Sequence, residues 1–263
     1  MTETFRPPES ADRAGAGRAG LVRNAARNNA RWCDAVCRAH GTPGAFTAES
    51  WTSAHRTPPL YPDAVTLTER ASAAELLARI DTGAPGCTVK DSFATLDLSA
   101  AGFSVLFEAQ WIHRPAGLPA PTPVDGVRWD VVRDAGALAS WAAAWAGEPD
   151  EGGPAGGAGG GPFRAELLDD AGTFFLRGRS GERVVAGAVA SRSGSVVGLS
   201  NVFAADGDTG SAWAGVFRAV AERWPERAAV GYESGDDLDA AIRHGSLPIG
   251  PLRVWWHPGR TDG

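Results

Sequence analysis

Alternating and helical spacings of apolar residues divide the second half of the chain into regular elements. Residues 184–191 are rich in Val and Ala and are followed, after a Ser-Gly turn pair, by a second apolar run over residues 196–203. These runs predict two neighbouring antiparallel strands. From Ser211 to Trp224 the apolar residues recur at helical spacing, so we expect a helix there.

The same patterns continue on both sides of this unit. From Gly126 the predicted order is β-α-(α)-β-β-β-α-β-α-β. The remaining strands are expected at residues 126–132, 173–179, 228–233 and 249–256, the helices at 135–145 and 236–244, and a helical turn at 163–169. Between them, residues 148–161 are almost all Gly, Pro and Ala, a composition that predicts a mobile surface loop.

The first half of the chain shows weaker patterns. Residues 1–18 are polar and predict a disordered leader. The strongest strand signal lies at residues 103–115, where apolar residues alternate from Phe103 to Trp111. We also expect a helix at 21–40, an aromatic and proline-rich loop at 46–62, a short strand at 64–67, and a short helix at 72–80 capped by Ser72. The proline-rich segment 118–123 places a boundary near Asp125, which gives an N-terminal α/β domain of residues 19–124 and a second domain of residues 125–263.

A strand that ends in a glycine-bearing loop before a helix directs several backbone N–H groups at one point. Residues 196–224 have this arrangement, with the loop at Asp206–Ser211. The helix dipole adds to the N–H groups, so the loop suits an anion such as a phosphate.

Residues 126–258, which contain this loop, resemble the GCN5-related N-acetyltransferase (GNAT) superfamily. The family holds the pyrophosphate of acetyl-CoA on an Arg/Gln-x-x-Gly-x-Gly/Ala loop, and Gly210-Ser211-Ala212 fits the second half of that pattern. The first position falls on Gly207 and is flanked by Asp206 and Asp208, whose charge opposes a pyrophosphate. The resemblance implies a GNAT-like mixed sheet with flanking helices. A degenerate second unit of the same kind is one interpretation of the N-terminal half.

The resemblance also implies a cofactor site and catalytic residues. Acetyl-CoA or another acyl-CoA would lie along Ser200, Asn201 and Val202, with its pyrophosphate at Gly207, Gly210, Ser211 and Ala212. Glu233 is the candidate base and Tyr232 the candidate acid. Alternative interpretations are a tyrosine packed at a strand end and acidic residues that cap the next helix, with Ser234 as N-cap.

Few other residues indicate chemistry. Lys90-Asp91, Glu108, Trp111 and His113 are candidates for a substrate pocket in the first half. The histidines have no metal-ligand spacing, so we expect no metal site. Among 263 residues, 31 are acidic and 25 basic, a net charge of −6 that disfavours nucleic acid as a main partner.

Cysteine content and hydropathy indicate the compartment. Cys33, Cys37 and Cys87 are an odd number without redox or metal spacing, which favours buried free thiols. No run approaches the length of a membrane span. We therefore expect a soluble, cytoplasmic protein.

The sequence thus favours an N-acyltransferase that moves an acyl group from acyl-CoA to an amine of a small molecule or peptide. One alternative is a GNAT-like protein that does not use CoA and either binds a ligand or partner or takes another acyl donor. A third is a non-catalytic interaction protein that docks through the glycine loop and its tryptophans.

Overall fold

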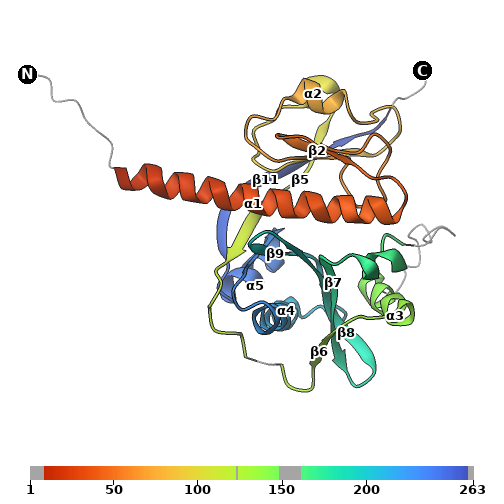
Figure 1. The fold of residues 1–263 in the computed structure, drawn as a ribbon, viewed down its shortest axis with the longest axis vertical. Helices are drawn as coiled ribbons and strands as arrows, with labels where there is room; N and C mark the ends of the chain where they lie inside the picture. The colour runs from red at the N-terminus through yellow and green to blue at the C-terminus, as the bar shows by residue number, and fades with distance from the viewer. Residues whose placement is uncertain (1–8, 123, 148–160, 260–263) are drawn as a thin grey trace, which may run out of the picture.

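A computed structural model describes residues 9–122, 124–147 and 161–259, which form one mixed sheet with helices on both faces (Figure 1). The helices are α1 (Glu9–Ala39), α2 (Ala73–Leu77), α3 (Ala135–Ala146), α4 (Thr209–Arg223) and α5 (Gly235–Arg243), with 3₁₀ turns η1 (Ser99–Ala101) and η2 (Ala165–Asp169). The strands are β1 (Ala45–Phe46), β2 (Ser50–Thr52), β3 (Ala64–Thr66), β4 (Cys87–Asp91), β5 (Ser104–Arg114), β6 (Arg128–Val131), β7 (Thr173–Ser180), β8 (Arg183–Ser193), β9 (Val196–Ala204), β10 (Ala228–Glu233) and β11 (Leu247–His257).

The order of elements from β6 onward confirms the predicted β-α-(α)-β-β-β-α-β-α-β pattern. β8 and β9 are antiparallel neighbours, as the two apolar runs predicted. The strands lie in the order β1-β2-β3-β4-β11-β5-β10-β9-β8-β7-β6. This mixed sheet with flanking helices is the GNAT-like fold class that the sequence indicated.

The last strand joins the two halves of the chain. β11 pairs with β4 on one side and β5 on the other, and β10 pairs with β5. The expected boundary near Asp125 therefore does not separate two sheets. Within residues 9–122 the order α1-β1-β2-β3-α2-β4-η1-β5 repeats the order α3-β7-β8-β9-α4-β10-α5-β11, with the 3₁₀ turn η1 in place of α5 and no counterpart of β6. In both halves the third and fourth strands of this order are parallel neighbours, β3 with β4 and β9 with β10, which agrees with a degenerate second unit.

Successive residues of the central strands face opposite layers of the core. Val196 packs with Val22 and Ala26 of α1, whereas Val197 packs with Val216 and other residues of α4. α1 and α3 share one hydrophobic cluster, and α4 and α5 share another. The period-two alternation of β9 therefore places α1 on one face of the sheet and α4 on the other.

Several expectations about the first half were wrong. α1 begins at Glu9 and replaces the disordered leader over residues 9–18, whose Ala and Arg content favours a helix. β1 and β2 lie in the segment expected to be a loop. The strand expected at residues 103–115 is β5, but along its first five residues, where it pairs only with β11, both faces are exposed, Val105 and Phe107 included.

Two further expectations concern the cap of α2 and the loop at residues 148–161. Ser72 caps α2 by accepting a hydrogen bond from the Glu75 N–H, as predicted. The expected mobile loop at 148–161 falls almost entirely outside the described residues.

α1 also links the two halves, through hydrogen bonds to β8 and a close approach to β9. Asn28 of α1 is buried; its amide nitrogen donates to the Ser191 carbonyl oxygen at 2.7 Å, and its Oδ1 accepts from the Ser191 hydroxyl at 3.0 Å. A Cβ atom on Gly198 of β9 would lie 1.7 Å from Asn28 Oδ1. Only glycine allows the helix to lie this close to the strand.

We therefore expect Gly198→Ala to lower the free energy of unfolding by about 1–3 kcal/mol, because the added methyl group displaces α1. The measurement is chemical denaturation. Gly20→Ala, in α1 with no atom near its Cβ position, is the control and should be neutral or slightly stabilising. Equal stability of Gly198→Ala and the wild type would contradict the close approach.

Candidate functional site

The two central parallel strands separate part of the way along their length. β9 and β10 pair only at Val196–Ala228, Val197–Ala229 and Gly198–Val230. Beyond these pairs β9 stays with β8, and β10 stays with β5. The facing backbone edges of Leu199–Val202 and Gly231–Glu233 are thus not paired with each other, and an opening lies between them.

A β-bulge widens this opening. Between the pairs Val189–Ser200 and Gly187–Phe203, one residue of β8 faces Asn201 and Val202 of β9. Asn201 has a φ of +53°, in the left-handed region that Asn tolerates better than most residues. A bulge bends its strand and increases the local twist, which turns β9 away from β10.

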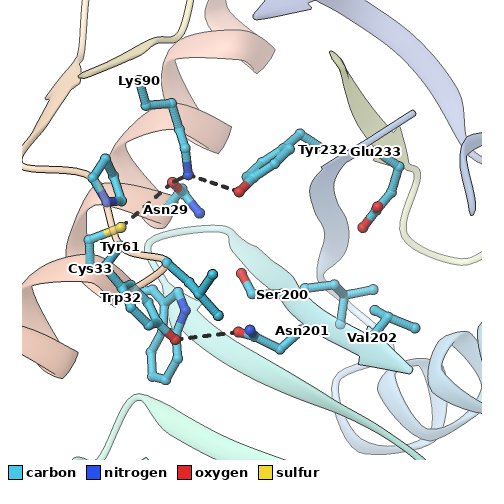
Figure 2. Close-up of a pocket in the computed structure, with 13 residues that line it drawn as sticks. Asn29, Trp32, Cys33, Tyr61, Lys90, Ser200, Asn201, Val202, Tyr232 and Glu233 are labelled. Carbon is cyan, nitrogen blue, oxygen red and sulfur yellow. Dashed lines mark hydrogen bonds between the residues drawn. The ribbon is translucent and has the colours of Figure 1, made fainter. Parts of the chain in front are cut away.

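A cavity of about 180 Å³ lies at this opening (Figure 2). It is lined from α1, the loop before β3, β4, and the separating ends of β9 and β10. The lining residues are Asn29, Trp32, Cys33, Leu60, Tyr61, Pro62, Lys90, Leu199, Ser200, Asn201, Val202, Tyr232 and Glu233. The predicted catalytic pair and the predicted Ser200, Asn201 and Val202 therefore come together here.

Glu233 has an altered acidity in the cavity. Burial of its carboxyl group and the negative charge of nearby Asp237 raise the pKa of Glu233 to about 8. Asp237 is held in place by the Trp213 indole N–H, which donates to it at 2.9 Å. A carboxyl group that titrates near neutral pH suits the removal of a proton from an amine. Ser234 occupies the N-cap position of α5, but its side chain makes no cap hydrogen bond.

Tyr232 is fixed by its neighbours. Its hydroxyl accepts a hydrogen bond from Lys90 Nζ at 3.0 Å, and that nitrogen also donates to Asn29 Oδ1 at 2.8 Å. The ring meets Trp111 edge to face at 5.4 Å between centroids. The phenol is therefore oriented toward the cavity by contacts on two sides, as Figure 2 shows for Lys90.

The opposite wall is aromatic and neutral. Trp32 and Tyr61 meet edge to face at 5.9 Å, and burial raises the pKa of Tyr61 well above its usual value. The Tyr61 hydroxyl donates to Asn201 Oδ1 at 3.5 Å. Burial also raises the pKa of Cys33. All three cysteines are buried and free, as the sequence predicted.

In the predicted anion loop at the start of α4, several backbone N–H groups donate to oxygen atoms of the loop itself. Asp208 caps the helix: its carboxylate accepts from the Ser211 N–H at 3.0 Å and the Ser211 hydroxyl at 2.6 Å. These hydrogen bonds hold the pKa of Asp208 below its usual value. Other backbone N–H groups of the loop donate to backbone oxygens: Gly207 to Ala204, Thr209 to Gly207, and Ala212 to Asp208. A bound pyrophosphate at Gly207, Gly210, Ser211 and Ala212 stays a prediction.

The candidates from β5 lie outside this cavity. Glu108 is exposed and pairs with Arg253 at 2.6 Å. The Trp111 indole donates to the Ser92 carbonyl oxygen at 2.8 Å and supports Tyr232 from behind. His113 is half-buried, and burial lowers its pKa. A substrate-binding role for these three residues stays a prediction.

Sequence reasoning missed the contributions of α1 and the Tyr61 loop. Asn29, Trp32 and Tyr61 are far from β9 and β10 in sequence, and only tertiary packing brings them together. The one local signal was Asn28-Asn29, two amides within an otherwise apolar helix face. Buried amides of this kind need partners, and Asn29 finds one in Lys90.

The described part of the chain offers no metal centre and no membrane span. Across residues 9–122, 124–147 and 161–259, no group of three His, Cys, Asp or Glu side chains gathers in a geometry that suits a metal ion. In the same ranges, no helix has the length and apolar content needed to cross a bilayer.

Solved structures share this fold. A GCN5-related N-acetyltransferase from Kribbella flavida is 18% identical, with a TM-score of 0.60 over 90% of this chain and 96% of that chain. A functionally unknown conserved protein from Staphylococcus epidermidis is 10% identical, with a TM-score of 0.54 over 71% of this chain and 77% of that one. A GNAT-family protein from Novosphingobium aromaticivorans is 15% identical, with a TM-score of 0.50 over 88% and 99%. No family model and no curated protein match the sequence.

The raised pKa of Glu233 predicts a pH dependence of stability. Its folded-state pKa, about 8, exceeds the ordinary value of 4.5, so the folded protein holds this proton over that interval. The contribution of Glu233 to stability is therefore complete below about pH 4.5 and is lost as pH rises through about 8. Relative to Glu233→Gln, the wild type should lose about 1–3 kcal/mol of unfolding free energy between pH 5 and 8.5. Denaturation curves at both pH values measure this difference, and parallel pH dependence of the two proteins would contradict it.

Proposed function

We propose that this chain, whose fold is that of the GCN5-related N-acetyltransferases, transfers an acyl group from acyl-CoA to an amine of a small molecule or peptide. The observation that carries the proposal is the opening between β9 and β10, with the Glu233 carboxyl and the Tyr232 phenol at its edge. Acyl transfer to an amine needs an extended groove, a base and an acid, and these features meet in one place.

In this proposal the two substrates approach the opening from opposite faces of the sheet. α4 lies on one face of β9, and the cavity reaches α1 on the other. The donor would lie along β9 from the α4 side, where the unpaired backbone groups of Leu199–Val202 suit an amide-containing chain such as pantetheine. The acceptor amine would then enter from the side of α1.

The proton steps depend on the two side chains. Acyl-CoA supplies an electrophilic carbonyl carbon and a thiolate leaving group. The amine nitrogen forms the new bond to that carbon as the carbon–sulfur bond breaks. Glu233 takes the proton that the amine loses, and the Tyr232 hydroxyl gives a proton to the departing sulfur. Proton return from Glu233 to the Tyr232 phenolate, directly or through water, restores both groups.

One observation favours the alternative in which CoA is not the donor. The unpaired edge of β9 suits the pantetheine part of CoA. The loop at the start of α4, however, already contains an anion of its own, the Asp208 carboxylate. In this second candidate function, the same opening binds a ligand, or an acyl donor without a pyrophosphate. The two candidates differ in whether CoA binds.

For the acyltransferase, we expect Glu233→Gln and Tyr232→Phe each to reduce kcat by about 100-fold, the usual contribution of a general acid or base. Wild-type kcat/KM should rise with pH through about 8, because Glu233 acts when it is ionised, and Glu233→Gln should lose that rise. The measurement is release of free CoA thiol with a panel of amines. Glu226→Gln, on the surface, is the control and should keep full activity. Full activity of both site variants would remove these residues from the mechanism.

For the donor, we expect weak CoA binding that tightens about fivefold in the double variant Asp206→Asn, Asp208→Asn, because two negative charges near the pyrophosphate are removed. Asn caps a helix about as well as Asp, so the start of α4 is preserved. Calorimetry with CoA measures the affinity. The control is the double variant Asp81→Asn, Asp97→Asn, in the loops that flank β4. It changes the net charge by the same amount and should leave the affinity for CoA unchanged. No CoA binding by either the wild type or the double variant at millimolar concentration would favour the second candidate.

A further inference from the structure

The cavity contains a buried cation without a counter-charge. Lys90 is the only lysine of the chain, and only 4% of its surface is exposed. Its amino group donates to Asn29 Oδ1 and to the Tyr232 hydroxyl, both neutral, and lies 4.3 Å from the centre of the Tyr232 ring. Among residues 9–122, 124–147 and 161–259, none of the ion pairs includes Lys90.

The neighbouring carboxylate is committed elsewhere. Asp91 follows Lys90 in β4, so its side chain points to the other face of the sheet. There it accepts hydrogen bonds from the Leu96 N–H at 2.8 Å and the Phe93 N–H at 3.3 Å. Asp91 therefore does not neutralise Lys90.

An unpaired buried charge is costly, and proteins ordinarily pair such groups. A ligand that carries the opposite charge would remove that cost on binding. A lysine amino group has three hydrogens to donate, and the contacts with Asn29 and Tyr232 use two of them. The third is left for a group in the cavity, which Lys90 lines.

The lining indicates which anion fits. Lys90 is the one basic side chain among the residues that line the cavity, and Glu233 is the one acidic side chain. A single lysine matches a singly charged carboxylate, whereas a phosphate would bring a second charge that no other basic side chain of the lining neutralises. The volume of about 180 Å³ is below the roughly 300–1,000 Å³ of pockets for drug-sized ligands, so the ligand is small.

We propose that Lys90 forms a carboxylate subsite and that the acyl acceptor is a small amino carboxylate, of the amino-acid class. Its carboxylate lies at Lys90, its amine is directed toward Glu233, and Tyr232 stands between them (Figure 2). The aromatic wall of Trp32 and Tyr61 receives its side chain. The assignment of the amine rests on the proposed acyl transfer; the carboxylate subsite itself does not.

The sole lysine gives a direct test by NMR. Lysine-selective ¹³C labelling yields one Cε–Hε signal, from Lys90, in the full-length protein. Titration with propionate should shift this signal saturably, and propionamide, of the same shape but uncharged, should not shift it. A signal that responds to both molecules equally, or to neither, would overturn the subsite.

Steady-state kinetics tests the acceptor class. The probes are glycine, alanine, phenylalanine and glutamate, each compared with its carboxamide. The wild type should prefer the free carboxylate at least tenfold in kcat/KM, mainly through KM, and Lys90→Met should abolish the preference. Because Lys90 also holds Tyr232, Lys90→Met lowers kcat for both members of a pair, and the ratio isolates the carboxylate contact.

The outcomes separate the two proposals. If the amino acids and their carboxamides are acylated at equal rates, the carboxylate subsite is overturned and the proposed acyl transfer stands. A saturable propionate shift without acylation of any probe would support the subsite and count against the proposed function.

Discussion

The incomplete pairing of β9 and β10 is the constraint on which the site depends. Backbone N–H and C=O groups need partners, and in most sheets the adjacent strand provides them. Here the two strands share three residue pairs and then run beside different neighbours. The bulge at Asn201, in the ladder with β8, bends β9 just beyond its last pair with β10. The groove is therefore a property of the backbone, and side chains determine only what enters it.

α1 forms one wall of the cavity that lies at the opening in the sheet. Its amides serve two distinct purposes one residue apart: Asn28 attaches the helix to β8, while Asn29 faces the cavity and holds Lys90. Gly198 allows this arrangement by leaving room for Asn28. The same contact that stabilises the packing of the two halves thus places the polar end of the cavity. A change at this junction would alter stability and site geometry together.

Local patterns predicted the elements better than their arrangement. The order from β6 to β11, the β8–β9 hairpin and the Ser72 cap are consequences of periodicity and capping chemistry, which act over a few residues. Periodicity carries no information on strand order, so the place of β11 between β4 and β5 was not predictable. The same limit decides which residues of the site could be predicted from the sequence. Tyr232 and Glu233 were found at a strand end and Ser200 within an apolar strand, whereas Asn29, Trp32 and Tyr61 reach the cavity only through the packing of α1 and its neighbouring loop.

The burial of Lys90 has a consequence for the outside of the molecule. Every other basic side chain is an arginine or a histidine, so the surface carries no lysine amine. Arginine stays protonated and is a poor nucleophile under physiological conditions. A thioester or other activated acyl compound in the surrounding solution therefore finds no lysine amine on this surface to acylate. No lysine on the surface therefore competes with the acceptor for an acyl group.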